Sequence, residues 1–134
     1  MSVPYILPSG RIAKSDIAAL IERRGHKIVS RHFTAKKLDE SHGEYWLTRD
    51  ATDIDHAWHI ALYDTKRLQI ILLYVPAGGL PPHKFPISVR KKGGKKRDFF
   101  IEADYNPQKN TELRERQSDI DFAQFKKDII SVQK

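Results

Sequence analysis

Residues 68–75, Leu-Gln-Ile-Ile-Leu-Leu-Tyr-Val, contain the longest apolar run of the chain, which extends from Ile70 to Val75. A β-strand presents alternate side chains to opposite faces of its sheet, and both alternating sets are apolar here. Strands of this kind are typically buried on both faces. The run is also much shorter than the ~20 residues that a membrane-spanning helix requires. We therefore predict that residues 68–75 form a central strand of a sheet, and we expect no membrane as a partner.

Strand-like segments lie on both sides of this central strand. They are residues 26–33, 44–47, 56–63, 85–91 and 97–104. Residues 63–67 are polar and connect two of the predicted strands, which indicates a hairpin turn there. Short connections between consecutive strands favour antiparallel pairing, so the sequence predicts a mainly antiparallel sheet.

Helices are expected at both ends of the chain. An apolar stripe at Ile17, Leu20 and Ile21 is followed by Gly25, a residue typical of helix C-termini. Ser118 is a candidate N-cap for a second helix. The apolar stripe of that helix consists of Phe122, Phe125, Ile129 and Val132.

The expected fold class is α+β. We predict a single domain over residues 1–134 with about six mainly antiparallel strands in a curled sheet, flanked by an N-terminal and a C-terminal helix. Residues 85–104 form a basic β-hairpin in this prediction, and residues 105–117 form a polar connection.

The composition excludes several classes of protein. The 134 residues include 40% hydrophobic side chains, which is typical of a folded globule and not of a disordered chain. The absence of cysteine excludes disulfide bonds and thiolate metal sites. The first residues lack the basic and apolar regions of a signal peptide, so a cytoplasmic protein is expected.

The net charge of +7 comes from one short segment. Residues 1–83 carry a balance of +2 and residues 98–134 a balance of −2. Residues 84–97, which we call the basic segment, contain seven cationic side chains and no acid. Such a concentration of positive charge is typical of surfaces that bind nucleic acid, an anionic membrane or an acidic protein.

The register of the predicted hairpin follows from the pairing of its side chains. A three-residue loop starting at Gly93-Gly94 opposes Val89 to Phe99, which keeps one face apolar, and Arg90 to Asp98, which pairs opposite charges. A two-residue loop would mix apolar and acidic side chains on one face. The sequence therefore favours the three-residue loop.

The same register opposes Lys91 to Arg97 and Lys92 to Lys96 at the tip of the hairpin. Like charges that face each other destabilise a strand pair, so the tip is suited to an anion that would neutralise them. We predict that the tip binds the phosphates of DNA or RNA. The predicted contact residues are Lys84, Arg90, Lys91, Lys92, Gly93, Gly94, Lys95, Lys96 and Arg97. A structural alternative is that these lysines protect an exposed sheet edge from aggregation.

Catalytic chemistry is a second interpretation of the sequence. Asp64-Thr65-Lys66 has the Asp-x-Lys pattern found in the metal-binding half of many nucleases, with Asp55 upstream as a further carboxylate. The same three residues also fit an ordinary hairpin turn.

Histidines provide the remaining catalytic candidates, namely His42, His56 and His59. The closest pair, His56 and His59, is separated by three residues, which on a strand places the two rings on opposite faces. We therefore expect no metal site from this pair. Mg²⁺ is expected as a cofactor only if the protein is a metal-dependent nuclease.

The leading functional hypothesis is a non-catalytic nucleic-acid-binding domain that belongs to a DNA-processing system. A small nuclease or RNase that uses the aspartates, Lys66 and the histidines is the first alternative. The second is a protein-interaction domain whose basic tip attracts an acidic partner. No feature of the sequence indicates an oligomeric state or a preference between DNA and RNA.

Overall fold

The computed structural model describes residues 5–6, 14–28, 32–50, 56–79, 88–89, 96–104, 112–115 and 120–133. Over these residues the chain forms one α-helix, a 3-10 turn and nine strands in two sheets. The α+β class and the predominance of antiparallel pairing are confirmed, because five of the seven strand pairs are antiparallel. The assignment of the whole chain to one domain stays a prediction.

The first sheet has five strands, and the predicted central strand lies in its middle. Its order is β1-β9-β5-β4-β2. The strands are β1 (Tyr5–Ile6), β2 (Phe33–Lys37), β4 (Trp58–Asp64), β5 (Gln69–Val75) and β9 (Lys126–Gln133). β5 pairs antiparallel with β4 and β9, whereas the outer pairs β1–β9 and β2–β4 are parallel. The apolar run therefore forms the central strand, as predicted.

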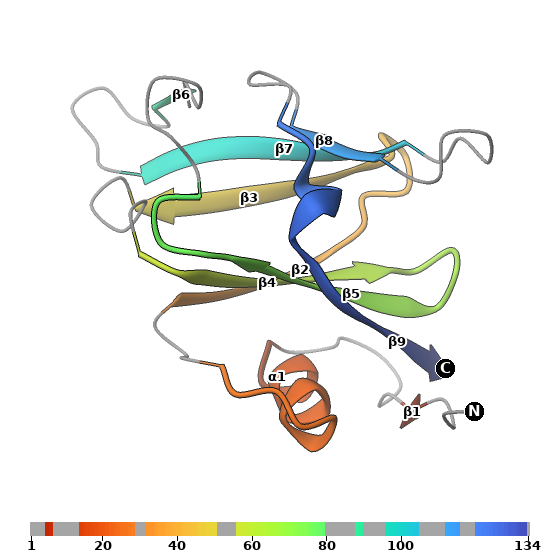
Figure 1. The fold of residues 1–134 in the computed structure, drawn as a ribbon. Coiled ribbons are helices and arrows are strands. Elements are labelled where there is room, and N and C mark those ends of the chain that lie inside the picture. Colours follow the sequence, from red (N-terminus) through yellow and green to blue (C-terminus); the bar gives the residue numbers. More distant parts are fainter. Residues whose placement is uncertain are drawn as a thin grey trace.

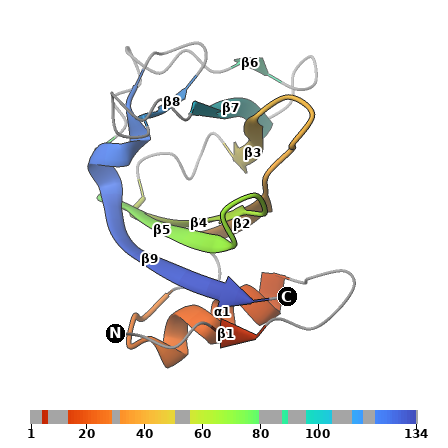
Figure 2. The same ribbon diagram turned by 90° about the vertical axis from the view of Figure 1, so that its right-hand side faces the viewer.

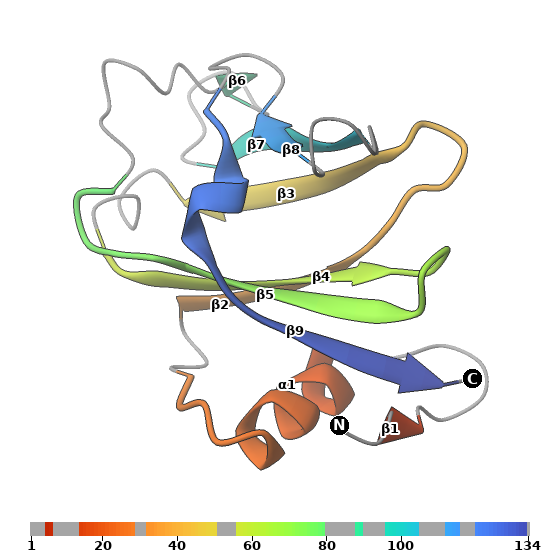
Figure 3. The ribbon, with the colours of Figure 1, turned by 45° about the vertical axis from the view of Figure 1, so that its right-hand side comes forward.

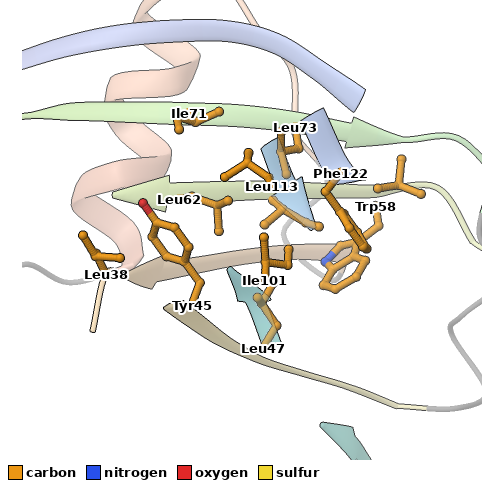
Figure 4. Close-up of a cluster of buried hydrophobic side chains, with 12 residues drawn as sticks. Leu38, Tyr45, Leu47, Trp58, Leu62, Ile71, Leu73, Ile101, Leu113 and Phe122 are labelled. Atoms are coloured by element: carbon orange, nitrogen blue, oxygen red, sulfur yellow. The ribbon is translucent and has the colours of Figure 1, made fainter. Parts of the chain in front are cut away.

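The second sheet covers one face of the first, and both appear edge-on in Figure 1. Its strands are β3 (Glu44–Asp50), β6 (Ser88–Val89), β7 (Lys96–Asp104) and β8 (Glu112–Glu115). β7 pairs with β3 on one edge and with β6 and β8 on the other. Between the sheets lies a core of large side chains, including Trp58 and Tyr45 (Figure 4).

The opposite face of the five-stranded sheet packs against the helix α1 (Lys14–Arg23), as Figures 1 and 3 show. Ile17, Leu20 and Ile21 are buried there, as their helical spacing predicts. Gly25 has φ of 103° and follows the helix as its C′ residue. Its N–H donates to the Glu22 carbonyl at 2.9 Å, and the N–H of residue 26 donates to the Ile21 carbonyl at 3.2 Å, which is a Schellman cap.

The predicted C-terminal helix is wrong. Residues Phe122–Phe125 form a single 3-10 turn, η3, and the chain continues as β9. Asp121 caps η3 by accepting a hydrogen bond from the Ala123 N–H at 2.9 Å. The residues that follow include Ile129-Ile130 and Val132, whose branched side chains favour a strand. Residues 126–133 therefore form a strand that pairs with β5, and this pairing outweighs the helical spacing of the apolar residues.

The single curled sheet and the first predicted strand also differ from the structure. The strands divide into two sheets, and the core that contains Trp58 and Tyr45 is buried between them. Residues 26–28 form no strand, because the Schellman cap holds the first of them; the strand begins later, at Phe33. The predicted polar connection, residues 105–117, contains the strand β8. Among the described residues no helix has the length and hydropathy needed to cross a membrane.

The segment around η3 connects the two sheets, and Figure 2 shows the chain passing from one layer to the other. Before η3, the N–H of Glu115 in β8 donates to the Ile120 carbonyl at 2.8 Å. After η3, the chain enters β9 at the other layer. Phe122 is fully buried between the sheets and contacts Phe125 edge-on, with ring centroids 5.6 Å apart. This segment therefore both connects the two layers and contributes Phe122 to the core between them.

Candidate nucleic-acid interface

The outer face of the four-stranded sheet carries an exposed aromatic pair. Side chains alternate along β3, so that Tyr45 and Leu47 are buried between the sheets and Trp46 points outward. Trp46 is directly paired with Phe100 of β7. The two rings are stacked, with centroids 5.8 Å apart and planes 25° apart. Trp46 is 52% exposed, more than any other large hydrophobic side chain that the structure describes.

Polar residues surround this aromatic pair. On β3, Trp46 lies between Glu44, which is buried, and Thr48, which is partly exposed. On β8, Arg114 is partly exposed and is paired in register with Glu102 of β7. We call Trp46 and Phe100, with Thr48 beside them, the aromatic face.

The basic segment ends in the same sheet. β7 begins with Lys96 and Arg97, so Phe100 follows the basic segment on one continuous strand. Residues 90–95 lie outside the described residues, and so does Lys84. The predicted tip, including Gly93-Gly94, is therefore not described, and of Lys96 and Arg97 only the backbone is described.

The predicted register of the hairpin is wrong by two residues. Ser88, not Arg90, is paired with Asp98, and Val89 is paired with Arg97. The reason is that β8 occupies the same edge of β7 from Ile101 to Asp104, which leaves only the first part of β7 for β6. Because the shift is even, each residue keeps the face that alternation assigned to it.

The turn between β2 and β3 carries a compact polar cluster at one end of the aromatic face. Gly43 has φ of 64°, and its N–H donates to the Asp39 carbonyl at 2.7 Å. The Asp39 carboxylate accepts from the Ser41 hydroxyl at 2.7 Å and lies 2.9 Å from Nδ1 of His42. Hydrogen bonds from Ser41 and His42 hold the pKa of Asp39 below its usual value, so the carboxylate is ionised at neutral pH.

Two side chains of this turn and the first side chain of β3 have the geometry of a cation site. One ligand atom each from Asp39, His42 and Glu44 lies within 4.8 Å of the other two. Carboxylate oxygens and an imidazole nitrogen suit divalent ions such as Mn²⁺ and Zn²⁺. Of the three, only His42 was singled out by the sequence.

The Asp-x-Lys pattern occupies a turn, where Asp64 has structural partners. Asp64 is 1% exposed, and its carboxylate accepts from the backbone N–H groups of Lys66 at 3.0 Å and Arg67 at 3.1 Å. The guanidinium of Arg67 forms an ion pair with the same carboxylate. Lys66 is exposed, and Asp55 lies outside the described residues. This geometry gives Asp64 the role of stabilising the β4–β5 turn.

The other candidate histidines do not join the cluster around His42. His56 stacks on His32, with ring centroids 4.8 Å apart. His59 contacts Tyr74, also with ring centroids 4.8 Å apart. Burial is the main cause that lowers the pKa of His59, and the electrostatic effect of Lys127 adds to it, which favours the neutral imidazole.

His26 belongs to a separate polar cluster near the end of α1. Its Nε2 lies 2.9 Å from the carboxylate of Asp128 in β9, and Nε of Arg24 lies 3.1 Å from the same oxygen. Partial burial opposes ionisation of Asp128, but hydrogen bonds from His26 and Arg24 outweigh it and lower the pKa of Asp128. This cluster joins α1 to the five-stranded sheet.

Sequence reasoning missed the aromatic face. The run Tyr45-Trp46-Leu47 is apolar throughout, so the sequence does not indicate that one of its three side chains points to solvent. Only the pairing with β7 shows that Trp46 and Phe100 share the outer face. The available signal is the two-residue period of a strand, which places the side chain of Trp46 on the opposite face from those of Tyr45 and Leu47.

The chain matches no protein-family model, no curated protein and no solved structure.

Proposed function

We propose that the protein is a nucleic-acid-binding domain. The observation that carries this proposal is that the basic segment continues directly into β7, whose Phe100 supports the exposed Trp46. The last two cations of the basic segment, Lys96 and Arg97, therefore lie on the same sheet as the exposed ring. Among the described residues, the other exposed aromatic side chain, Tyr74, lies on the five-stranded sheet.

The two parts of the interface have different roles. Lysines and arginines neutralise phosphates and release counterions, which provides affinity without sequence specificity. Aromatic rings contact the bases, which every nucleotide presents. Contacts of both kinds are consistent with a domain that holds nucleic acid within a DNA-processing system, and that assignment stays a prediction.

The proposal is tested by the salt dependence of binding. Changing Lys91, Lys92, Lys95 and Lys96 together to glutamine is expected to weaken binding and to flatten the plot of log affinity against log salt. The slope should fall by up to about 0.9 for each lost contact with duplex DNA and about 0.7 for each lost contact with a single strand. Fluorescence anisotropy with labelled DNA and RNA at several salt concentrations measures both quantities.

A matched control removes the same charge elsewhere. Changing Lys36, Lys37, Lys126 and Lys127 to glutamine removes four exposed lysines from the five-stranded sheet. This variant should retain most of the wild-type slope. Equal slopes in the two variants would show that only the net charge matters, and the basic segment would lose its assigned role. A wild-type protein that binds neither nucleic acid would favour the acidic protein partner.

A second candidate function is a metal-dependent nuclease, and the arrangement of Asp39, His42 and Glu44 favours it. These groups lie at the start of β3. Trp46 is on the same strand, two residues after Glu44. A divalent ion held there would polarise a phosphate and lower the pKa of a bound water.

The expected result for this second candidate is cleavage of labelled DNA or RNA that requires Mg²⁺ or Mn²⁺ and stops with a chelator. His42→Ala should slow cleavage by ~10-fold or more, because it removes a ligand of the ion. His56→Ala is the matched control, since His56 is also exposed but stacks on His32 outside the cluster. If the protein binds DNA or RNA but cleaves neither with Mg²⁺ or Mn²⁺, the nuclease candidate is contradicted and the non-catalytic function is left.

A further inference from the structure

We propose that the nucleic acid bound by this protein is single-stranded, and that one unpaired base stacks on the indole of Trp46. The inference rests on the proposed function and specifies its substrate class.

The structure holds Trp46 ready for such a contact. Seven consecutive register pairs join β3 to β7, so the backbone that carries Trp46 is fixed along its whole strand. The ring is supported by Phe100 at 5.8 Å and remains 52% exposed. An indole that is already ordered loses little conformational freedom when a base stacks on it.

Duplex nucleic acid does not offer the surface that this indole would contact. In a double helix the faces of the bases are covered by their neighbours, and only the base edges reach the grooves. An unpaired strand can turn its bases outward and place them against aromatic side chains. A ring that is 52% exposed on a sheet face therefore suits single strands.

The positive charge of the chain favours nucleic acid over a second copy as the occupant of the aromatic face. The basic segment has seven cationic residues and no acid, and it ends in β7 at Arg97, three residues before Phe100. A second copy of this chain would bring the same positive charge and would be repelled. A single strand would present phosphates to the cations of the basic segment and bases to Trp46, so it would use the chemistry of both.

The tryptophan content of the chain allows a direct test. The protein has two tryptophans, Trp46 on the aromatic face and Trp58, which is 2% exposed between the sheets. Binding of an unlabelled single strand of about 15 nucleotides should quench the fluorescence of the wild type through base stacking. Trp46→Phe keeps an aromatic ring but leaves only the buried Trp58, so the quenching should be lost.

Affinity gives a second and independent measurement. Trp46→Ala should weaken binding of single-stranded DNA or RNA by about 5- to 100-fold, the effect expected for one base–aromatic stack. Tyr74→Ala is the matched control, because Tyr74 is 37% exposed and lies on the other sheet. Its affinity should equal that of the wild type. Thermal unfolding of both variants verifies that they are folded.

The outcomes separate this inference from the proposed function. Tighter binding of single strands than of duplex, with the losses at Trp46, supports both. Binding of duplex at least as tight as that of single strands, with no effect of Trp46→Ala, overturns the inference and leaves the proposed function intact. Binding of single strands without quenching also overturns it. A protein that binds none of these probes contradicts both.

Discussion

Replacing Phe122 with alanine is expected to lower the free energy of unfolding by about 3–5 kcal/mol. The ring is fully buried in the core between the two sheets, at the point where the chain crosses from β8 to β9. Its removal leaves a cavity and loosens the connection that separates the layers. Chemical denaturation measures the effect as a lower midpoint at an unchanged m value.

Ile129→Ala is the matched control for this prediction. Ile129 lies on β9, in the same segment that was predicted to be a helix, but it is 43% exposed. Its loss should cost much less than that of Phe122, since little apolar surface leaves the core. Similar losses at the two positions would mean that Phe122 does not have its assigned place between the sheets.

Replacing Asp64 with alanine is expected to lower the free energy of unfolding by about 2–4 kcal/mol. The change removes the acceptor of two backbone N–H groups and leaves Arg67 without its buried counter-ion. The side chain of Arg67 is 32% exposed and its guanidinium can turn toward water, so the lower half of the range is expected. Equilibrium denaturation in urea measures the change.

Two further variants show the cause of this loss. Asp64→Asn keeps an oxygen that can accept from the turn but loses the charge, so it should lie between alanine and the wild type. Lys66→Ala changes an exposed side chain of the same turn and should be nearly neutral. If Asp64→Ala were fully stable, the carboxylate would be free for another role, and the Asp-x-Lys pattern would regain its catalytic interpretation.

Phe122 and Asp64 both belong to sequence patterns that fit more than one structure. Asp64 and Lys66 match a pattern of nuclease sites, and the structure shows why they also match a turn. In that turn the aspartate is buried while the lysine is exposed. Spacing alone does not separate these causes, because it carries no information about burial.

The candidate interface also shows which features a sequence pattern reveals and which it does not. The basic segment is visible in the sequence because charge is a property of residue type and needs no fold. The aromatic face is not visible, since Trp46 and Phe100 lie on strands that are far apart in the chain and meet only through the β3–β7 register. The cluster of Asp39, His42 and Glu44 was also missed, because a turn brings its atoms together.

Local features of the fold follow from the sequence by itself. Within residues 68–75, the four consecutive apolar side chains of residues 70–73 are buried on both faces, as expected for β5 in the middle of its sheet. The end of α1 is equally local, because Gly25 adopts the positive φ that a Schellman cap requires.

Tertiary structure alone decided the fate of the C-terminal segment and the division into two sheets. The spacing of Phe122, Phe125, Ile129 and Val132 fits a helix, but without β9 the N–H and C=O groups along one edge of β5 would lack partners. Residues 126–133 satisfy that edge as β9, and the turn at η3 places Phe122 between the layers. Backbone hydrogen bonding between distant segments thus overrode a local pattern, and the same kind of pairing brought Trp46 to the surface beside Phe100.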